Sequence, residues 1–270
     1  MTPRRSRQRR AGANVAIQLD QLWTWVLAFF WPFVRVAAML SAAPLIGGRL
    51  LPMRVRLMLA LVLTGVVLPL VGPVPALDPL SPGGLLVVVN QVLIGAAMGL
   101  ALQVVFNALV VGGQIIGASM GLGFASVVDP QNGIQVPVVS QLYFLMGALI
   151  FLALDGHLRM VELVARSFAT LPLDGGLGPR HFQGLALWGA LMFSEGMRLA
   201  LPVVSVVLLT NLALGVATRA APQLNVFALG FSVTLILGLA AMLLSLGHLG
   251  PLFTDLLARG FATMAALVAG

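Results

Sequence analysis

The sequence contains no cysteine and few charged side chains, and both absences narrow the class of protein. Without cysteine, structural disulfides and thiolate metal sites are excluded. Only 9% of the residues are charged and 60% are hydrophobic, whereas a soluble globular domain has roughly 25% charged residues. We therefore expect an integral membrane protein built from α-helices.

Motifs of common enzymes are also absent. The sequence has no H-E-x-x-H, P-loop or dinucleotide-binding pattern. We accordingly predict a protein that is not an enzyme and that has no cofactor and no metal site.

Lysine is missing as well, so all 15 basic residues are arginine, and five of them lie within the first ten positions. We assign residues 1–20 to a basic tail and residues 21–270 to a single membrane domain, because no linker or block of charge divides the rest. A cleaved signal is disfavoured, since Pro32 and Arg35 interrupt the first apolar stretch. The tail fits a cytoplasmic anchor on anionic membrane lipid, or alternatively a disordered solubilising extension, and we expect no nucleic acid as a partner.

Apolar stretches separated by proline, glycine or charge predict about six hydrophobic helices arranged in hairpins. The stretches lie at about 22–46, 57–72, 84–112, 138–154, 184–215 and 224–248. The fourth is expected to continue as one helix from Pro137 to Ala169, about 50 Å long at 1.5 Å per residue. Loops on the cytoplasmic side of a membrane protein usually carry more arginine, but here that excess exists only when the tail is counted. This weak bias suggests that the helices pack in an assembly rather than each crossing lipid.

Between Asp78 and Asp129 the chain has 50 residues without an ionisable side chain. This stretch exceeds the about 20 residues of one membrane crossing. Its last part, from Gly113 to Val128, would form a half-helix of about 24 Å before Asp129-Pro130 forces a turn. We predict a re-entrant, glycine-rich loop, which is tolerated at membrane depth only inside protein or along a water-filled cavity.

Glycines recur every four residues at Gly113, Gly117 and Gly121, which on a helix gives a smooth face for close packing. The contact could be with another subunit or within the chain. The same stretch matches the G-x-S-x-G pattern at Ser119, and His248 could act as a base. An intramembrane serine protease is therefore an alternative, although a motif without its context is only a hypothesis.

Three charged residues, Arg35, Glu195 and Arg198, lie inside apolar stretches, where a lone charge costs at least about 2.5 kcal/mol. Glu195 and Arg198 are three residues apart and are predicted to form a buried ion pair. Arg35 has no partner nearby in the sequence and should face protein, carbonyl groups or water. One carboxylate at this depth is too few for a typical proton-coupled carrier.

Several motifs occur in the order seen in the FliR/SctT family of type III secretion export-gate proteins, which the chain resembles along nearly its whole length. These motifs are Trp31-Pro-Phe-Val-Arg35-Val, Ser41-Ala-Ala-Pro44, Pro52-Met-Arg-Val-Arg56, Gly117-Ala-Ser-Met-Gly-Leu-Gly-Phe-Ala-Ser-Val-Val-Asp-Pro130, Asp155-Gly-His-Leu158 and Arg219-Ala-Ala-Pro-Gln-Leu-Asn-Val-Phe-Ala-Leu-Gly-Phe231. They look more like the flagellar branch than the injectisome branch.

The resemblance implies a FliP-like unit joined to a FliQ-like unit, packed in a closed helical export gate at the flagellar basal body in the bacterial inner membrane. FliP, FliQ and FlhB would be its partners, and unfolded flagellar proteins its cargo. It also implies a pore seal at Met120, Phe124, Val127 and Val128. The packing and hinge positions would be Gly113, Gly117, Gly121, Gly123, Asp129 and Pro130, and the subunit interface would include Pro222, Gln223, Asn225 and Gly230.

Two other functions stay open. The chain could be the injectisome SctT homologue of such a gate, or a multi-pass transporter for a small solute. A transporter would need a defined ligand site and would work as the purified chain alone.

Overall fold

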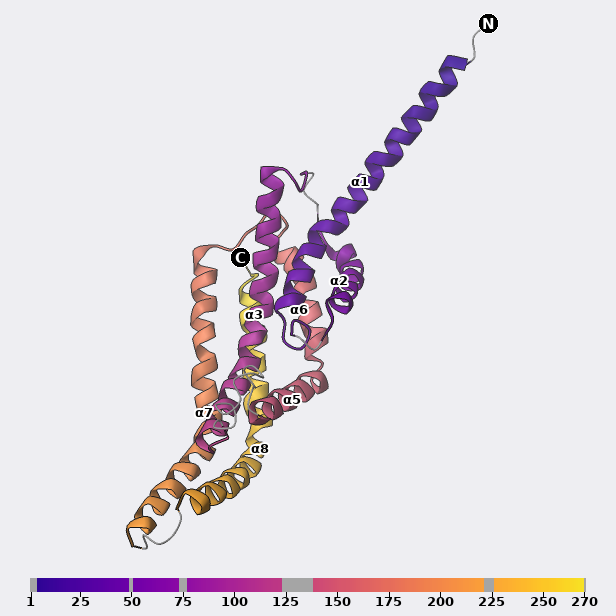
Figure 1. Cartoon of the computed structure of the whole chain (residues 1–270). Helices are drawn as coiled ribbons and strands as arrows, with labels where there is room; N and C mark the ends of the chain where they lie inside the picture. The colour runs from indigo at the N-terminus through magenta and orange to yellow at the C-terminus, as the bar shows by residue number, and fades with distance from the viewer. Residues whose placement is uncertain (1–3, 49–50, 73–76, 123–137, 221–225, 270) are drawn as a thin grey trace. The chain divides into compact units, whose positions relative to one another are not determined.

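The computed structural model describes residues 4–48, 51–72, 77–122, 138–220 and 226–269, and in these ranges the chain is helical without a strand. Figure 1 shows the order of the elements. They are α1 (Arg4–Ala42), α2 (Met53–Val67), the short 3-10 helix η1 (Leu68–Leu70), α3 (Pro82–Ser119), α5 (Val138–Ala153), α6 (Gly156–Thr170), α7 (Pro179–Ala220) and α8 (Val226–Ala266).

Five of these helices are long and apolar enough to cross a membrane, and α5 with α6 gives a sixth if the bent pair counts as one span. The prediction of an all-α membrane protein with about six hydrophobic helices is thereby confirmed. The backbone of residues 4–20 is helical and continuous with the first span, which differs from the disordered extension considered above. The last helix reaches Ala266 through Pro251, well beyond the predicted end at 248.

The single long helix predicted from Pro137 to Ala169 is wrong. The helix breaks at Leu154–Asp155, where Asp155 has a φ of 53°, a left-handed conformation that ends regular helix geometry. Beyond the break, Glu162 and Arg166 pair at 2.6 Å with side chains more than half exposed. Hydropathy reports the length of an apolar stretch but not a backbone break inside it.

The chain packs as two compact units. The first comprises residues 1–100, 160–181 and 264–270, and the second comprises residues 101–159 and 182–263. Helix α3 contributes its first half to one unit and its second half to the other. The expectation of one domain over 21–270 stays a prediction.

In the first unit, α1 meets the first half of α3 along a very close contact. Gly95 and Gly99 of α3 form a G-x-x-x-G pair, and both are buried. A Cβ atom at Gly95 would overlap the carbonyl oxygen of Arg35, and one at Gly99 would lie 2.6 Å from that of Met39. The two helix backbones therefore approach at a distance that only glycine allows.

Arg35 lies fully buried in the same unit, and no carboxylate among the described residues pairs with it. Its Nε donates to Gln91 Oε1 at 2.6 Å, and its Nη1 donates to the backbone oxygen of Ser167 at 2.9 Å and to Ser167 Oγ at 3.0 Å. Its Nη2 donates to the carbonyl of Leu171 at 2.9 Å, and its Cζ lies 4.3 Å from the ring centre of Phe168. The guanidinium thus binds the carbonyl-rich C-terminal end of α6, where the helix dipole favours a cation.

The second unit is built around a cluster of aromatic rings. Phe106 of α3 contacts Phe144 and Phe151 of α5 and Phe253 of α8, with ring centres 5.4 to 5.6 Å apart. Trp188 of α7 donates its Nε1 hydrogen to the carbonyl of Ala101 at 2.8 Å. Together these contacts fix α3, α5, α7 and α8 around one apolar core.

The α1–α3 contact leads to a first prediction. Gly95→Ala should lower the free energy of unfolding by about 1–3 kcal/mol, because the added Cβ overlaps a backbone carbonyl that cannot move independently. Gly65→Ala on α2 is the matched control, since nothing lies within 4 Å of its Cβ position; it should be neutral or stabilising by up to about 1 kcal/mol. Unfolding followed by circular dichroism in detergent measures both, and equal stabilities would contradict the contact.

The Arg35 site gives a second prediction. Arg35→Met should destabilise the chain by about 3–5 kcal/mol, because Gln91 and the carbonyls at the end of α6 lose their buried donor. Arg35→Lys should recover only part of that loss, since one ammonium cannot reproduce the planar fork of donors. Arg166→Met, on the exposed side of α6, serves as the control and should change stability by less than about 0.5 kcal/mol. Comparable melting temperatures for Arg35→Met and Arg166→Met would refute this account.

Candidate functional site

The glycine-rich segment begins at the end of α3, and the structure shows how that helix stops. The amide of Leu122 bonds to the carbonyl of Gly117 at 2.9 Å, and the amide of Gly121 bonds to that of Ala118 at 3.1 Å. Gly121 has a φ of 79°. This pair of bonds around a left-handed glycine is a Schellman motif, which ends a helix and turns the chain away.

The half-helix predicted from Gly113 to Val128 is therefore wrong in both its limits. Gly113 lies inside the continuous helix α3, and that helix ends at Ser119. At 38 residues, α3 would be about 57 Å long at 1.5 Å per residue, longer than the roughly 30 Å hydrocarbon core. Gly121 was predicted as a packing or hinge position, and its left-handed backbone ends the helix.

The other two glycines of the predicted face are buried, and contacts within the chain surround the first. A Cβ atom at Gly113 would lie 2.5 Å from the Cα of Ser140 on α5. Beside it, the Cβ position of Gly112 lies 3.0 Å from the carbonyl of Gly196 on α7. Gly117 is also buried. These contacts bring α3, α5 and α7 together just before the helix end.

Met120 and Gly230, predicted for the seal and for the subunit interface, line the same hollow in the second unit. It has a volume of about 630 Å³ and lies between the end of α3, the last turns of α7 and the start of α8. Met120 is itself buried at 1% exposure and contacts α8, where a Cβ at Gly238 would lie 2.8 Å from its Cγ. Thr234 donates to Asn211 Oδ1 across the hollow at 3.0 Å.

The remaining residues of these predictions fall outside the described ranges. For the seal and hinge they are Gly123, Phe124, Val127, Val128, Asp129 and Pro130, and for the interface Pro222, Gln223 and Asn225. Their roles stay predictions.

Glu195 has a nearer partner than the one predicted from sequence. Its Oε1 lies 2.8 Å from Arg259 Nη2 on α8, whereas Arg198 Nη1 is 3.8 Å from its Oε2. The Glu195 side chain is 9% exposed and that of Arg198 is 68% exposed. Arg259 also binds Asp255 at 3.1 Å. Sequence reasoning missed Arg259 because 64 residues separate it from Glu195, although its i,i+4 spacing from Asp255 marks a charged helix face.

The protease alternative finds no support at Ser119. Its hydroxyl donates to the carbonyl of Ile116 at 2.8 Å, and no histidine bonds to it within the described chain. His248 instead lines a separate cavity between α7 and α8. Among the described residues, no group of three or more histidine, aspartate or glutamate side chains could hold a metal ion.

Comparison with known proteins gives a consistent picture. Residues 26–260 match the family described as bacterial export proteins, family 1. The chain is 39% identical over 245 residues to the flagellar biosynthetic protein FliR of Pectobacterium carotovorum subsp. carotovorum, covering 90% of this chain and 94% of that protein.

Two further relatives carry the same name. FliR of Escherichia coli (strain K12) is 37% identical over 92% of this chain and 95% of its own length. FliR of Aquifex aeolicus (strain VF5) is 32% identical over 89% of this chain and 90% of its own length. With the family match covering nearly all of the described helices, this chain belongs to family 1 of the bacterial export proteins, the family of the flagellar biosynthetic FliR proteins.

Proposed function

We propose that this chain is a non-catalytic subunit of the flagellar type III export gate in the bacterial inner membrane, where it forms with FliP and FliQ the channel for unfolded flagellar proteins. The observation that carries the proposal is the family match over residues 26–260, together with relatives named as flagellar biosynthetic proteins. Those names favour the flagellar gate over the injectisome gate.

The surface of the helices supports a role in an assembly. Large apolar side chains are exposed along α2, α7 and α8, among them Met58, Val62, Leu208, Leu209, Leu212 and Leu244. Lipid or neighbouring subunits can cover such faces. In the proposed gate, neighbouring subunits contact Pro222, Gln223 and Asn225, which lie between α7 and α8 in the sequence, and Gly230 in the first turns of α8. FlhB is a further partner.

The pore seal is proposed for the segment that follows the end of α3. A narrow ring of apolar side chains blocks ions and water because water does not fill it. Phe124, Val127 and Val128 supply those side chains, while Gly121 turns the chain out of the helix just before them. Met120, buried against α8, holds the base of the segment to the second unit.

Assembly is tested by co-purification. A tagged copy of this chain, expressed with the FliP and FliQ of the same organism, should retain both proteins through affinity and size-exclusion steps. A chain that purifies alone, and that transports a solute when reconstituted by itself, would favour the transporter instead.

Sealing is tested by conductance of the assembled complex in planar bilayers. Phe124→Gly and Val127→Asp should raise resting ion leakage while export continues, because they remove or wet the apolar constriction. Phe193→Gly, which removes an exposed ring on α7, is the matched control and should leave the leakage unchanged. The seal is assigned to the wrong residues if all three variants leak no more than the unmodified complex.

A further inference from the structure

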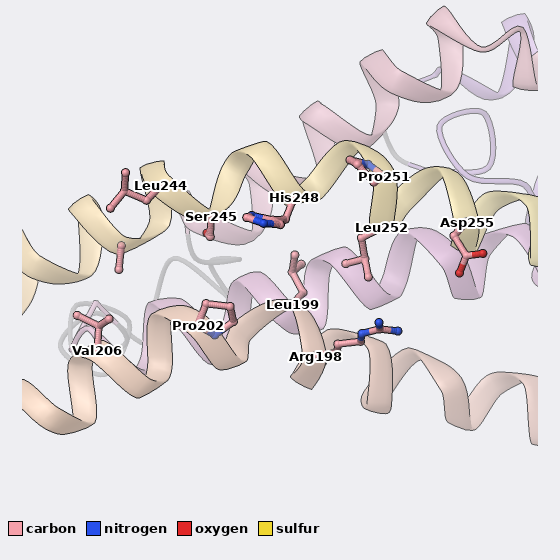
Figure 2. Close-up of a pocket in the computed structure, with 11 residues that line it drawn as sticks. Arg198, Leu199, Pro202, Val206, Leu244, Ser245, His248, Pro251, Leu252 and Asp255 are labelled. Atoms are coloured by element: carbon pink, nitrogen blue, oxygen red, sulfur yellow. The ribbon is translucent and has the colours of Figure 1, made fainter.

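A groove between α7 and α8 in the second unit has no part in the proposed gate function. Its volume is about 700 Å³, within the roughly 300–1,000 Å³ of small-molecule sites. Figure 2 shows its two ends: Val206, Pro202 and Leu244 lie at one, and Arg198 and Asp255 lie at the other, with His248 between the helices. The groove is therefore apolar at one end and charged at the other.

The charged end presents two exposed side chains, Arg198 and Asp255, each with one ion-pair contact and with further polar atoms facing the groove. Arg259 lies between the two carboxylates, 2.8 Å from Glu195 and 3.1 Å from Asp255. Asp255 is 66% exposed, and its second oxygen, Oδ1, is bonded to no other group of the described chain. Arg198 is 68% exposed, and its one contact with the described residues is the long one of 3.8 Å to Glu195, so most of its five N–H donors are available.

The charged end of the groove has no net charge, so it does not favour a ligand that carries only negative charge. The two arginines balance the two carboxylates, and Arg198 and Asp255 extend from opposite walls of the groove (Figure 2). The end therefore matches a headgroup that carries both a negative and a positive charge.

The position of the charges along the helices also resembles that of a lipid headgroup. From Leu199 to Thr218, α7 has 20 residues without an ionisable side chain, which is about 30 Å and equals one hydrocarbon thickness. Arg198 and Arg219 mark the two ends of this stretch. A hydrocarbon core that covers this stretch would begin at the charged end of the groove and would set the apolar end beside the acyl chains.

We propose that this groove binds one phospholipid whose headgroup carries a phosphate and a primary ammonium, as in phosphatidylethanolamine. Arg198 binds the phosphate, and Asp255 accepts hydrogen bonds from the ammonium. One acyl chain lies along Leu199, Val206 and Leu244, and His248 faces the glycerol level between them. Phosphatidylcholine has no ammonium hydrogen to donate, and phosphatidylglycerol has no cation for Asp255. The proposal does not depend on the export function.

Native mass spectrometry of the full-length chain tests this site. The detergent-purified chain is incubated with equal amounts of dioleoyl phosphatidylethanolamine, phosphatidylcholine and phosphatidylglycerol. We expect a single retained lipid, with phosphatidylethanolamine about fivefold in excess over each of the others. Asp255→Asn should reduce phosphatidylethanolamine to the level of phosphatidylcholine and leave phosphatidylcholine unchanged. Arg198→Gln should lower retention of both.

Matched controls separate the site from charge in general. Arg166→Gln and Glu162→Gln change an exposed ion pair on α6 that lies outside the groove, and both should retain the same lipids as the unmodified chain. Ala241→Trp keeps every charge and fills the apolar end, so it should displace the lipid even if Asp255→Asn does not fold.

Three results would overturn the proposal. The first is equal retention of phosphatidylethanolamine and phosphatidylcholine by the unmodified chain. The second is a phosphatidylethanolamine preference that survives both Asp255→Asn and Ala241→Trp. The third has two parts: the chain loses the lipid when it is purified together with partner proteins, and Asp255→Asn weakens that complex. This result would mean that a protein segment, and not a lipid, occupies the groove.

Discussion

Charged side chains buried among apolar helices need hydrogen-bond or ion-pair partners within the protein, and in both units such partners come from other helices. In the first unit, Arg35 pairs with no carboxylate of the described chain and instead donates hydrogen bonds to Gln91 and to the carbonyls at the end of α6. In the second unit, Glu195 is neutralised by Arg259 from α8. Each site ties together segments that are far apart in the sequence, since an unsatisfied charge at such a position costs several kcal/mol. Two buried charges therefore help to specify which helices pack together.

The sequence predicts features that depend on neighbouring residues, and it does not predict contacts between segments that are far apart in the chain. The apolar stretches gave the number of hydrophobic helices, because span length follows directly from hydropathy. The burial of Arg35 was also predictable from its apolar surroundings. Its acceptors on α6 were not, because they are backbone carbonyls of a segment more than 130 residues away. The G-x-x-x-G pair at Gly95 and Gly99 could have been found by the same pattern search that selected Gly113 and Gly117.

Backbone conformation accounts for the remaining differences. Gly121 was placed on a packing face by its spacing and among the hinge positions by the family resemblance, and its left-handed φ ends the helix. Asp155, also with a positive φ, breaks the predicted long helix. A repeat of glycine every four residues is compatible with both roles, so spacing alone cannot choose between them. The family match then supplies what neither hydropathy nor packing contains, namely that the chain belongs to a family of bacterial export proteins.

The contact of α1 with Gly95 and Gly99 has a mechanical consequence. At these two glycines the backbones are in direct contact, and the side-chain atoms nearest to them are the methyl groups of Ala38 and Ala42, which cannot change rotamer to accommodate sliding. The two helices consequently behave as a single stiff strut when the protein is under load. If the chain lines the export channel proposed above, widening of that channel would have to occur in segments joined by flexible side chains, and this pair of helices would keep its spacing.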